Sequence, residues 1–95
     1  MNDKVLYSRE GRRTQIDRAE YQALREAIEA AMVRSGIGQR ELSRKLNKPF
    51  VYINRILNAR RTLEFAEFLD ICDAIGVDPL EVFATAIRTS RPQEG

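Results

Sequence analysis

Two short amphipathic segments separated by a tight turn, residues 39–46 and 50–57, constrain the fold of this chain more than any other feature. Their apolar residues recur at spacings of three and four, which is typical of an α-helix with one apolar face. These residues are Leu42, Leu46, Ile53 and Ile56. These four side chains are expected to face inward.

The connection between these segments has the residues of a sharp turn. Asn47 follows the first segment, and asparagine enters the region of positive φ at lower cost than most residues other than glycine. Pro49 suits the first turn of the second helix, where its missing N–H would be unsatisfied anyway. Gly38 is an acceptable N-cap for the first helix, although weaker than Ser or Thr. Asn58 is expected to end the second helix.

A longer helix is predicted before this pair, over residues 18–35. Asp17 and Glu20 have the spacing of a capping box, and Gly36 supplies a left-handed stop. The apolar residues expected on its inner face are Tyr21, Leu24, Ile28, Ala31 and Met32. Residues 1–16 show no clear period and are expected to form an arm or an irregular segment.

Two further helices are predicted after the pair. The first, over residues 63–75, has Thr62 as its expected N-cap, and its apolar stripe is Phe65, Phe68, Leu69, Cys72 and Ile75. The second, over residues 79–87, starts with a second capping box at Asp78, with a proline at its first helical position. The remaining residues, 88–95, are expected to form a polar tail.

The chain is thus expected to be one all-α domain over residues 17–87. No apolar run approaches the roughly 18 residues of a membrane span, and the N-terminus lacks the apolar region of a secretory signal. The lone cysteine, Cys72, permits no internal disulfide and suggests a reducing compartment. It is expected to be a buried small hydrophobe rather than a redox sensor.

Charge is sorted along the sequence. The formal net charge is +2, yet residues 34–61 hold eight basic residues and one acid, Glu41, whereas residues 62–87 hold six acids and no base. A basic pair of short helices with a tight turn is typical of proteins that hold duplex DNA. Without histidine, a glycine-rich phosphate loop or a nucleophile–base set, we expect no enzyme activity, no metal site and no cofactor.

Residues 36–61, G-I-G-Q-R-E-L-S-R-K-L-N-K-P-F-V-Y-I-N-R-I-L-N-A-R-R, resemble the helix-turn-helix of the Cro/C1-type (Xre-like) family of repressors and antitoxins. The similarity extends over residues 21–83. The matching positions are Gly36, Ile37, Gln39, Glu41, Leu42, Leu46, Pro49, Tyr52, Ile53, Ile56 and Arg61. The resemblance implies a five-helix, lambda-repressor-like DNA-binding domain with the helix-turn-helix at its second and third helices.

The resemblance also implies which residues contact DNA. The family's base-reading positions fall on Phe50, Val51, Asn54 and Arg55. Phosphate contacts are expected from Gln39, Arg44, Lys48, Tyr52, Asn58, Arg60 and Arg61. For Arg40 and Lys45, phosphate contact and plain solvation remain open. The basic residues of the arm, Arg9, Arg12 and Arg13, could enter a minor groove or belong to a disordered tail.

Some reading positions depart from the family pattern. Arg55 can bond guanine bidentately and Asn54 can pair with adenine. Phe50 and Val51 replace polar residues and cannot bond a base edge. Either they pack on thymine methyl groups, or one of them faces inward or a protein partner. Ala59 stands where the family has glycine, so Asn58 is expected to take the left-handed conformation instead.

A two-fold symmetric operator needs a dimer whose recognition helices are about 34 Å apart. We expect the last helix, with help from Leu57 or the N-terminal segment, to form an isologous homodimer interface. The residues expected in it are Leu80, Val82, Phe83 and Ile87.

The resemblance implies a sequence-specific transcriptional regulator, commonly a repressor. We expect a cytoplasmic protein of bacterial or phage type, associated with the nucleoid when bound to DNA. The alternative is a protein-interaction module of the same fold, an antitoxin or anti-activator with a protein partner.

Overall fold

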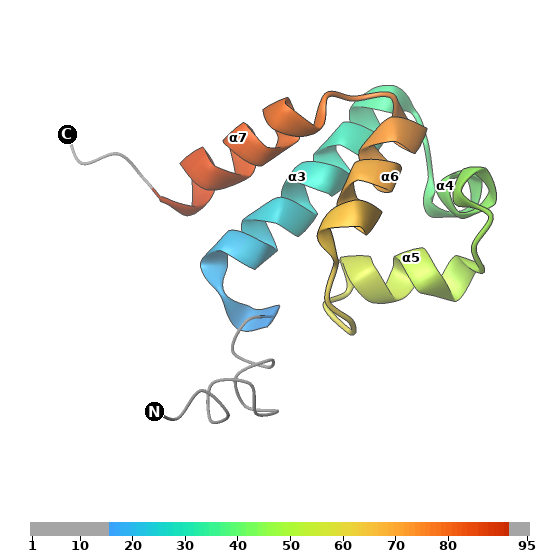
Figure 1. The fold of residues 1–95 in the computed structure, drawn as a ribbon, viewed down its shortest axis with the longest axis horizontal. Helices are drawn as coiled ribbons and strands as arrows, with labels where there is room; N and C mark the ends of the chain where they lie inside the picture. Colours follow the sequence, from blue (N-terminus) through green and yellow to red (C-terminus); the bar gives the residue numbers. More distant parts are fainter. Residues whose placement is uncertain (1–15, 92–95) are drawn as a thin grey trace.

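The computed structural model describes residues 16–91, which form five α-helices and no strand (Figure 1). The helices are α3 (Ala19–Ser35), α4 (Gln39–Leu46), α5 (Phe50–Leu57), α6 (Phe65–Ile75) and α7 (Pro79–Ser90). α7 packs along α3 on one side of the molecule, α4 and α5 lie at the other, and α6 lies between them. The all-α class is confirmed for these residues. The predicted arm, with its three arginines, lies outside them apart from Ile16.

The core lies where the five helices meet. Its deepest side chains, each less than 2% exposed, are Ile28, Leu42, Ile53, Ile56, Ile71 and Cys72. Burial, with a smaller effect from Asp78, raises the pKa of the Cys72 thiol to about 11. The thiol therefore stays protonated at neutral pH and acts as the small buried hydrophobe that the sequence predicts.

The turn between α4 and α5 has the predicted conformation. Asn47 ends α4 in the left-handed region, with φ 58° and ψ 45°, and its N–H donates to the carbonyl of Arg44 at 3.0 Å. The N–H of Lys48 donates to the carbonyl of Ser43 at 2.9 Å. Pro49 occupies the N-cap of α5 rather than its first helical position. These bonds hold the two helices of the helix-turn-helix in one arrangement.

The start of α3 differs from the prediction, because no side chain caps it. Arg18 occupies the N-cap, and its Nε lies 3.1 Å from Oε1 of Glu20. The predicted capping box between Asp17 and Glu20 is therefore wrong. The hydrogen bond from Arg18 lowers the pKa of Glu20 to about 2. The end of α3 is as predicted, with Gly36 left-handed at φ 71°.

α6 begins later than the sequence predicts. Glu64, and not Thr62, occupies its N-cap. The backbone N–H of Glu64 donates to Oε1 of Glu67 at 2.9 Å, which is the reciprocal contact of a capping box. Because an acidic side chain is favoured at a helix N-terminus, both glutamates suit this position.

α7 starts where predicted, since Oδ1 of Asp78 accepts a hydrogen bond from the N–H of Leu80 at 2.9 Å. The predicted capping box is wrong, because the bond of Asp78 goes to Leu80 and not to the N–H of Glu81. It continues to Ser90, three residues beyond the predicted end at Ile87. Part of the predicted polar tail is therefore helical.

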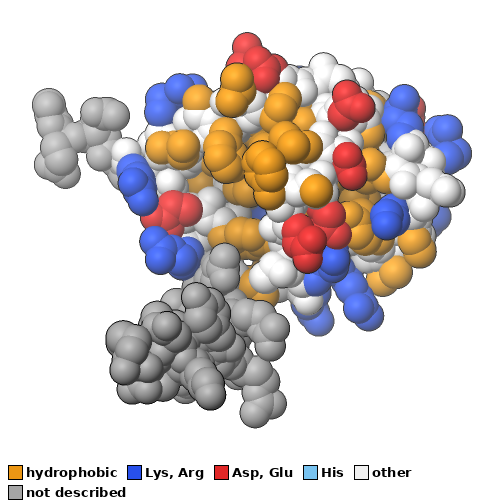
Figure 2. Space-filling view, viewed as in Figure 1, with side chains coloured by type: hydrophobic (Ala, Val, Ile, Leu, Met, Phe, Trp, Pro, Cys, Tyr) orange, Lys and Arg blue, Asp and Glu red, His pale blue; other side chains and the backbone are white. Residues whose placement is uncertain are grey.

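α6 and α7 expose a set of apolar side chains that we call the α6–α7 patch (Figure 2). It consists of Phe65, Leu69, Leu80, Phe83 and Ile87. The predicted stripe of α6 is partly wrong, because Phe65 and Leu69 are exposed whereas Ile71 is buried. Val82 and Leu57 are only 4% and 8% exposed, so both belong to the monomer core. Their expected part in a dimer interface is therefore wrong.

Candidate nucleic-acid interface

The predicted base-reading residues lie on the side of α5 that faces away from the core. Phe50 and Val51 are 40% and 50% exposed, Arg55 is exposed and Asn54 is half-buried. Neither Phe50 nor Val51 faces inward, which excludes one of the interpretations left open by the sequence.

A hollow runs along this side of α5 and the loop that follows it. Its lining residues are Val51, Asn54, Arg55, Asn58 and Arg60. The structure thus brings three predicted base-reading residues together with two predicted phosphate-contacting residues. Two guanidinium groups and two amides supply this hollow with donors in the forms that match guanine, adenine and phosphate.

The loop after α5 turns at Ala59. The φ of Ala59 is 61°, whereas that of Asn58 is −101°. The prediction that Asn58 takes the left-handed conformation is therefore wrong. Instead, the Asn58 side chain donates to the carbonyl of Asn54 at 2.9 Å and closes the last turn of α5. Beyond the turn, Arg60 is exposed and Arg61 is half-buried.

The first two residues of α4 reach across to α5. Nδ2 of Asn54 donates to Oε1 of Gln39 at 3.2 Å. The guanidinium carbon of Arg40 lies 4.8 Å from the centroid of the Phe50 ring, within the range of a cation–π contact. Both contacts restrict side chains that the sequence predicts to read bases. Arg40 therefore belongs to this surface, although its sequence position alone did not distinguish it from a solvated residue.

Arg61 and Tyr52 are tied to α6. Nη2 of Arg61 lies 3.1 Å from Oε2 of Glu67. The ring of Tyr52 has the Arg61 guanidinium carbon at 5.0 Å and the Lys48 ammonium at 5.2 Å from its centroid. Burial opposes ionisation of Glu67, but hydrogen bonds from the Glu64 N–H, Arg61 and Tyr52 outweigh it and lower its pKa. Arg61 thus joins the loop to α6.

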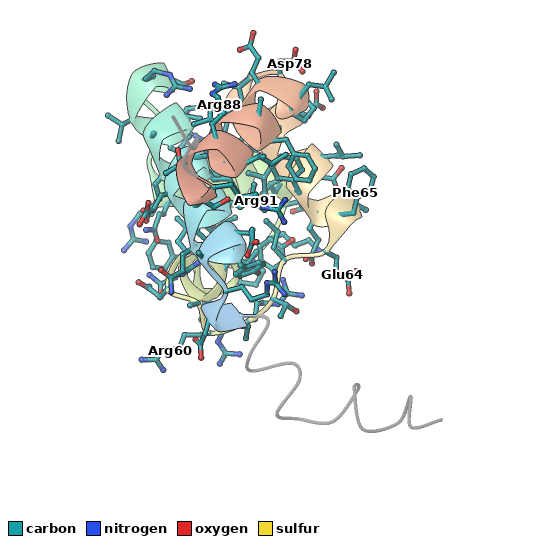
Figure 3. The ribbon with its side chains drawn as sticks, turned by 90° about the vertical axis from the view of Figure 1, so that its left-hand side faces the viewer. Arg60, Glu64, Phe65, Asp78, Arg88 and Arg91 are labelled. Atoms are coloured by element: carbon teal, nitrogen blue, oxygen red, sulfur yellow. The ribbon has the colours of Figure 1, made fainter. Side chains whose placement is uncertain are left out.

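The other predicted phosphate-contacting cations are open to solvent. Arg44, Lys48 and Arg60 are exposed, and within residues 16–91 none of them forms an ion pair. Lys and Arg side chains gather around α4 and α5 in Figure 2. Arg60 lies at the opposite end of the molecule from Asp78 (Figure 3). The charges that are sorted along the sequence therefore lie on different helices of the structure. The basic residues lie on α4, α5 and the loop after α5, and the acidic residues lie on α6 and at the start of α7.

This arrangement can be compared with known proteins. The model of a helix-turn-helix family matches residues 28–82, more than half of the chain. The chain belongs to the Cro/C1-type (Xre-like) helix-turn-helix family. This is a family of DNA-binding transcriptional regulators rather than of enzymes.

Solved structures agree with this assignment. The Cro/C1-type chain is similar to an XRE-family like protein from Pseudomonas syringae pv. tomato str. DC3000, with 34% identity and a TM-score of 0.71 over 77% of this chain and 89% of that one. It shares its fold with the clp gene regulator ClgR from C. glutamicum, with 20% identity and a TM-score of 0.70 over 78% and 96% of the two chains. A comparison with curated protein sequences finds no match.

Two features of this Cro/C1-type surface were missed by sequence reasoning. Glu67 was not predicted as the partner of Arg61, although its spacing of three from Glu64 is a capping-box signal. The stacking of Arg40 on Phe50 has no sequence signal, because it depends on how α4 crosses α5.

None of the helices within residues 16–91 is both long and apolar enough to cross a membrane.

Proposed function

We propose that this chain is a sequence-specific transcriptional repressor that reads a palindromic operator as a homodimer through α5. The observation that supports this most is the hollow along α5. There Asn54 and Arg55, which can pair with adenine and guanine in the major groove, lie between Val51 and the exposed Arg60. Such a repressor would work in the cytoplasm and associate with the nucleoid when bound.

The contacts divide into two groups in this proposal. Arg55 and Asn54 supply polar readout, and Phe50 and Val51 pack on thymine methyl groups. Phosphates are held by the remaining predicted residues, which are Gln39, Arg44, Lys48, Tyr52, Asn58, Arg60 and Arg61. Gln39 suits this role because it is the first residue of α4, where a helix N-terminus favours an anion. Its side-chain NH₂ group is the donor directed at phosphate, since its oxygen already accepts from Asn54.

The test begins with selection of bound duplexes from a random DNA pool by the full chain. We expect a palindromic consensus. Arg55→Ala should then weaken binding to that operator by about 1–3 kcal/mol in each half-site and relax the preference at the base pair that Arg55 reads, whereas salt-sensitive binding to any duplex should remain. Arg34→Ala, which removes an exposed arginine in the last turn of α3, is the matched control and should keep the preference. If Arg55→Ala binds the operator as tightly and selectively as the wild type, the proposed reading surface is wrong.

The second candidate is a protein-interaction module, an antitoxin or anti-activator. The exposed α6–α7 patch and the acidic residues of α6 favour it, because apolar patches with charged rims mark protein interfaces. Co-purification with a basic protein, together with no DNA shift at low salt, would support this candidate and count against the repressor.

A further inference from the structure

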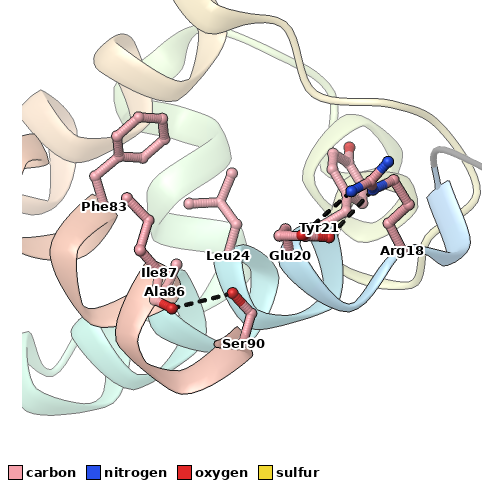
Figure 4. A pocket seen from close by; sticks show the side chains of 8 residues that line it. All are labelled: Arg18, Glu20, Tyr21, Leu24, Phe83, Ala86, Ile87 and Ser90. Atoms are coloured by element: carbon pink, nitrogen blue, oxygen red, sulfur yellow. Dashed lines mark hydrogen bonds and ion pairs between the residues drawn. The ribbon is translucent and has the colours of Figure 1, made fainter. Parts of the chain in front are cut away.

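Arg40 and Arg18 are both held by a neighbouring side chain, but in different ways. Arg18 donates to the two carboxylate oxygens of Glu20, at 3.1 and 3.2 Å, where both residues line a pocket between α3 and α7 (Figure 4). Arg40 is exposed and forms no ion pair within residues 16–91. It is held by the ring of Phe50 instead. A cation–π contact uses the charge of the guanidinium and leaves its N–H donors available.

The ring that holds Arg40 belongs to the first residue of α5. Phe50 is 40% exposed despite this contact, so the ring can touch DNA and the guanidinium together. Phe50 and Asn54 are four residues apart and therefore lie on the same face of α5. The first two residues of α4 lie along this face, since Gln39 accepts from Asn54 and Arg40 contacts Phe50. The start of α4 thus belongs to the same surface as the proposed reading side of α5.

Taking operator reading through α5 as given, we propose that Arg40 is a further base-reading residue, which bonds a guanine in the major groove while Phe50 holds it. In the proposed function, Phe50 packs on a thymine methyl group. The Arg40 guanidinium carbon lies 4.8 Å from the centroid of the Phe50 ring. Successive base pairs are about 3.4 Å apart, so this separation is between one and two base steps. Arg40 therefore reads a base pair next to the one that Phe50 contacts.

The chemistry of Arg40 favours guanine over the other partners that DNA offers. The paired donors of a guanidinium match the O6 and N7 acceptors of guanine. The contact with Phe50 also restricts the arginine before DNA binds, so less side-chain freedom is lost in the complex. A phosphate contact would place the guanidinium beside the DNA backbone, whereas Phe50 holds it beside a side chain proposed to face the bases.

The first test repeats the selection from a random duplex pool with Arg40→Ala. This variant should lose the preference for guanine at one position of each half-site, next to a selected thymine. Its affinity for the wild-type operator should fall about tenfold for each half-site. Arg44→Ala, on the same helix, is the comparison for a phosphate contact and should weaken binding to all duplexes alike.

The second test removes one acceptor from the DNA. The analogue 7-deazaguanine lacks the N7 acceptor of guanine but leaves the charge of the backbone unchanged. Placed at the selected guanine, it should weaken binding of the wild type about fivefold for each half-site, as measured by fluorescence anisotropy. Arg40→Ala should bind both duplexes equally. If the analogue weakens the wild type and the variant by the same factor, Arg40 does not bond this guanine.

The third test asks whether the ring positions Arg40. Phe50→Leu keeps an apolar side chain at this place but removes the aromatic face, whereas Phe50→Tyr keeps that face. Phe50→Leu should reduce the preference for guanine over 7-deazaguanine, and Phe50→Tyr should retain it. If both variants retain the full preference, Phe50 does not position Arg40.

The outcomes separate this proposal from the proposed function. A wild type that selects no consensus overturns operator reading and the role of Arg40 together. If Arg55→Ala relaxes the selected operator but Arg40→Ala keeps every preference, only the role of Arg40 is wrong. Equal weakening of all duplexes by Arg40→Ala also overturns this role, because it is the signature of a phosphate contact.

Discussion

Ala59 occupies a backbone conformation that costs a residue with a Cβ atom about 1–2 kcal/mol. Ala59→Gly should therefore raise the free energy of unfolding by about 0.5–1 kcal/mol, since glycine removes this cost but adds freedom to the unfolded chain. Urea denaturation measures the change. Ala30→Gly, at an exposed position in the interior of α3, should destabilise by about as much. An Ala59→Gly protein that is less stable than the wild type would show that the turn is not strained.

Phe50 and Val51 can be tested through the DNA. If they contact thymine methyl groups, replacing the operator thymines by uracil should weaken binding by about 0.8 kcal/mol for each methyl that is lost from a contact. Phe50→Ala and Val51→Ala should then bind the two duplexes with more equal affinity, as measured by fluorescence anisotropy. If uracil has the same effect on the wild type and on both variants, these side chains do not read methyl groups.

Single residues were predictable from sequence where the backbone alone decides their conformation. Gly36 and Asn47 end α3 and α4 in the left-handed region, which glycine and asparagine enter at lower cost than other residues. Asn58 and Ala59 were assigned the wrong way round. Either could turn the chain, and the choice depends on where the loop must deliver Arg61 to meet Glu67 on α6.

At the level of elements, this Arg61–Glu67 contact makes the stability of the junction between α5 and α6 depend on pH. The folded-state pKa of Glu67 lies below its ordinary value of 4.5. Its stabilising effect is therefore complete above that value and is lost as the pH falls below it. Glu67→Gln should be less stable than the wild type by about 0.5–1.5 kcal/mol at neutral pH.

The gap in unfolding free energy between wild type and Glu67→Gln should shrink as the pH falls from about 6 to about 3. Denaturant unfolding at several pH values measures it. Glu29→Gln, at an exposed position of α3, is the control and should track the wild type. A gap that stays constant across this range would show that the carboxylate charge is not what stabilises the junction.

The bounds of α4 and α5 were predicted correctly except at Pro49. Each of these helices has one apolar face, and only a few residue types allow the turn between them. The start of α6 was predicted wrongly, because Thr62 and Glu64 are both acceptable N-caps and tertiary contacts select between them. The end of α7 was placed early, since its last turn is polar and carries no periodic signal.

At the scale of the whole molecule, the resemblance gives the positions that we propose for the reading surface, but the candidate dimer surface did not follow from composition. Leu80 and Val82 are both aliphatic and lie on the same helix, yet one is 75% exposed and the other 4%. Only the docking of α7 on α3 decides which of them faces outward. A sequence can indicate that a helix has spare apolar surface, but not which side chains supply it.

The division of charge between elements gives the molecule a permanent electric dipole. Its positive end lies at α4 and α5, and its negative end at α6 and the start of α7. A polyanionic duplex exerts a torque on such a dipole and turns the α5 side toward itself before any contact forms. For the proposed reading of DNA through α5, this orientation raises the share of collisions that meet the reading side, and added salt shortens the range over which it acts.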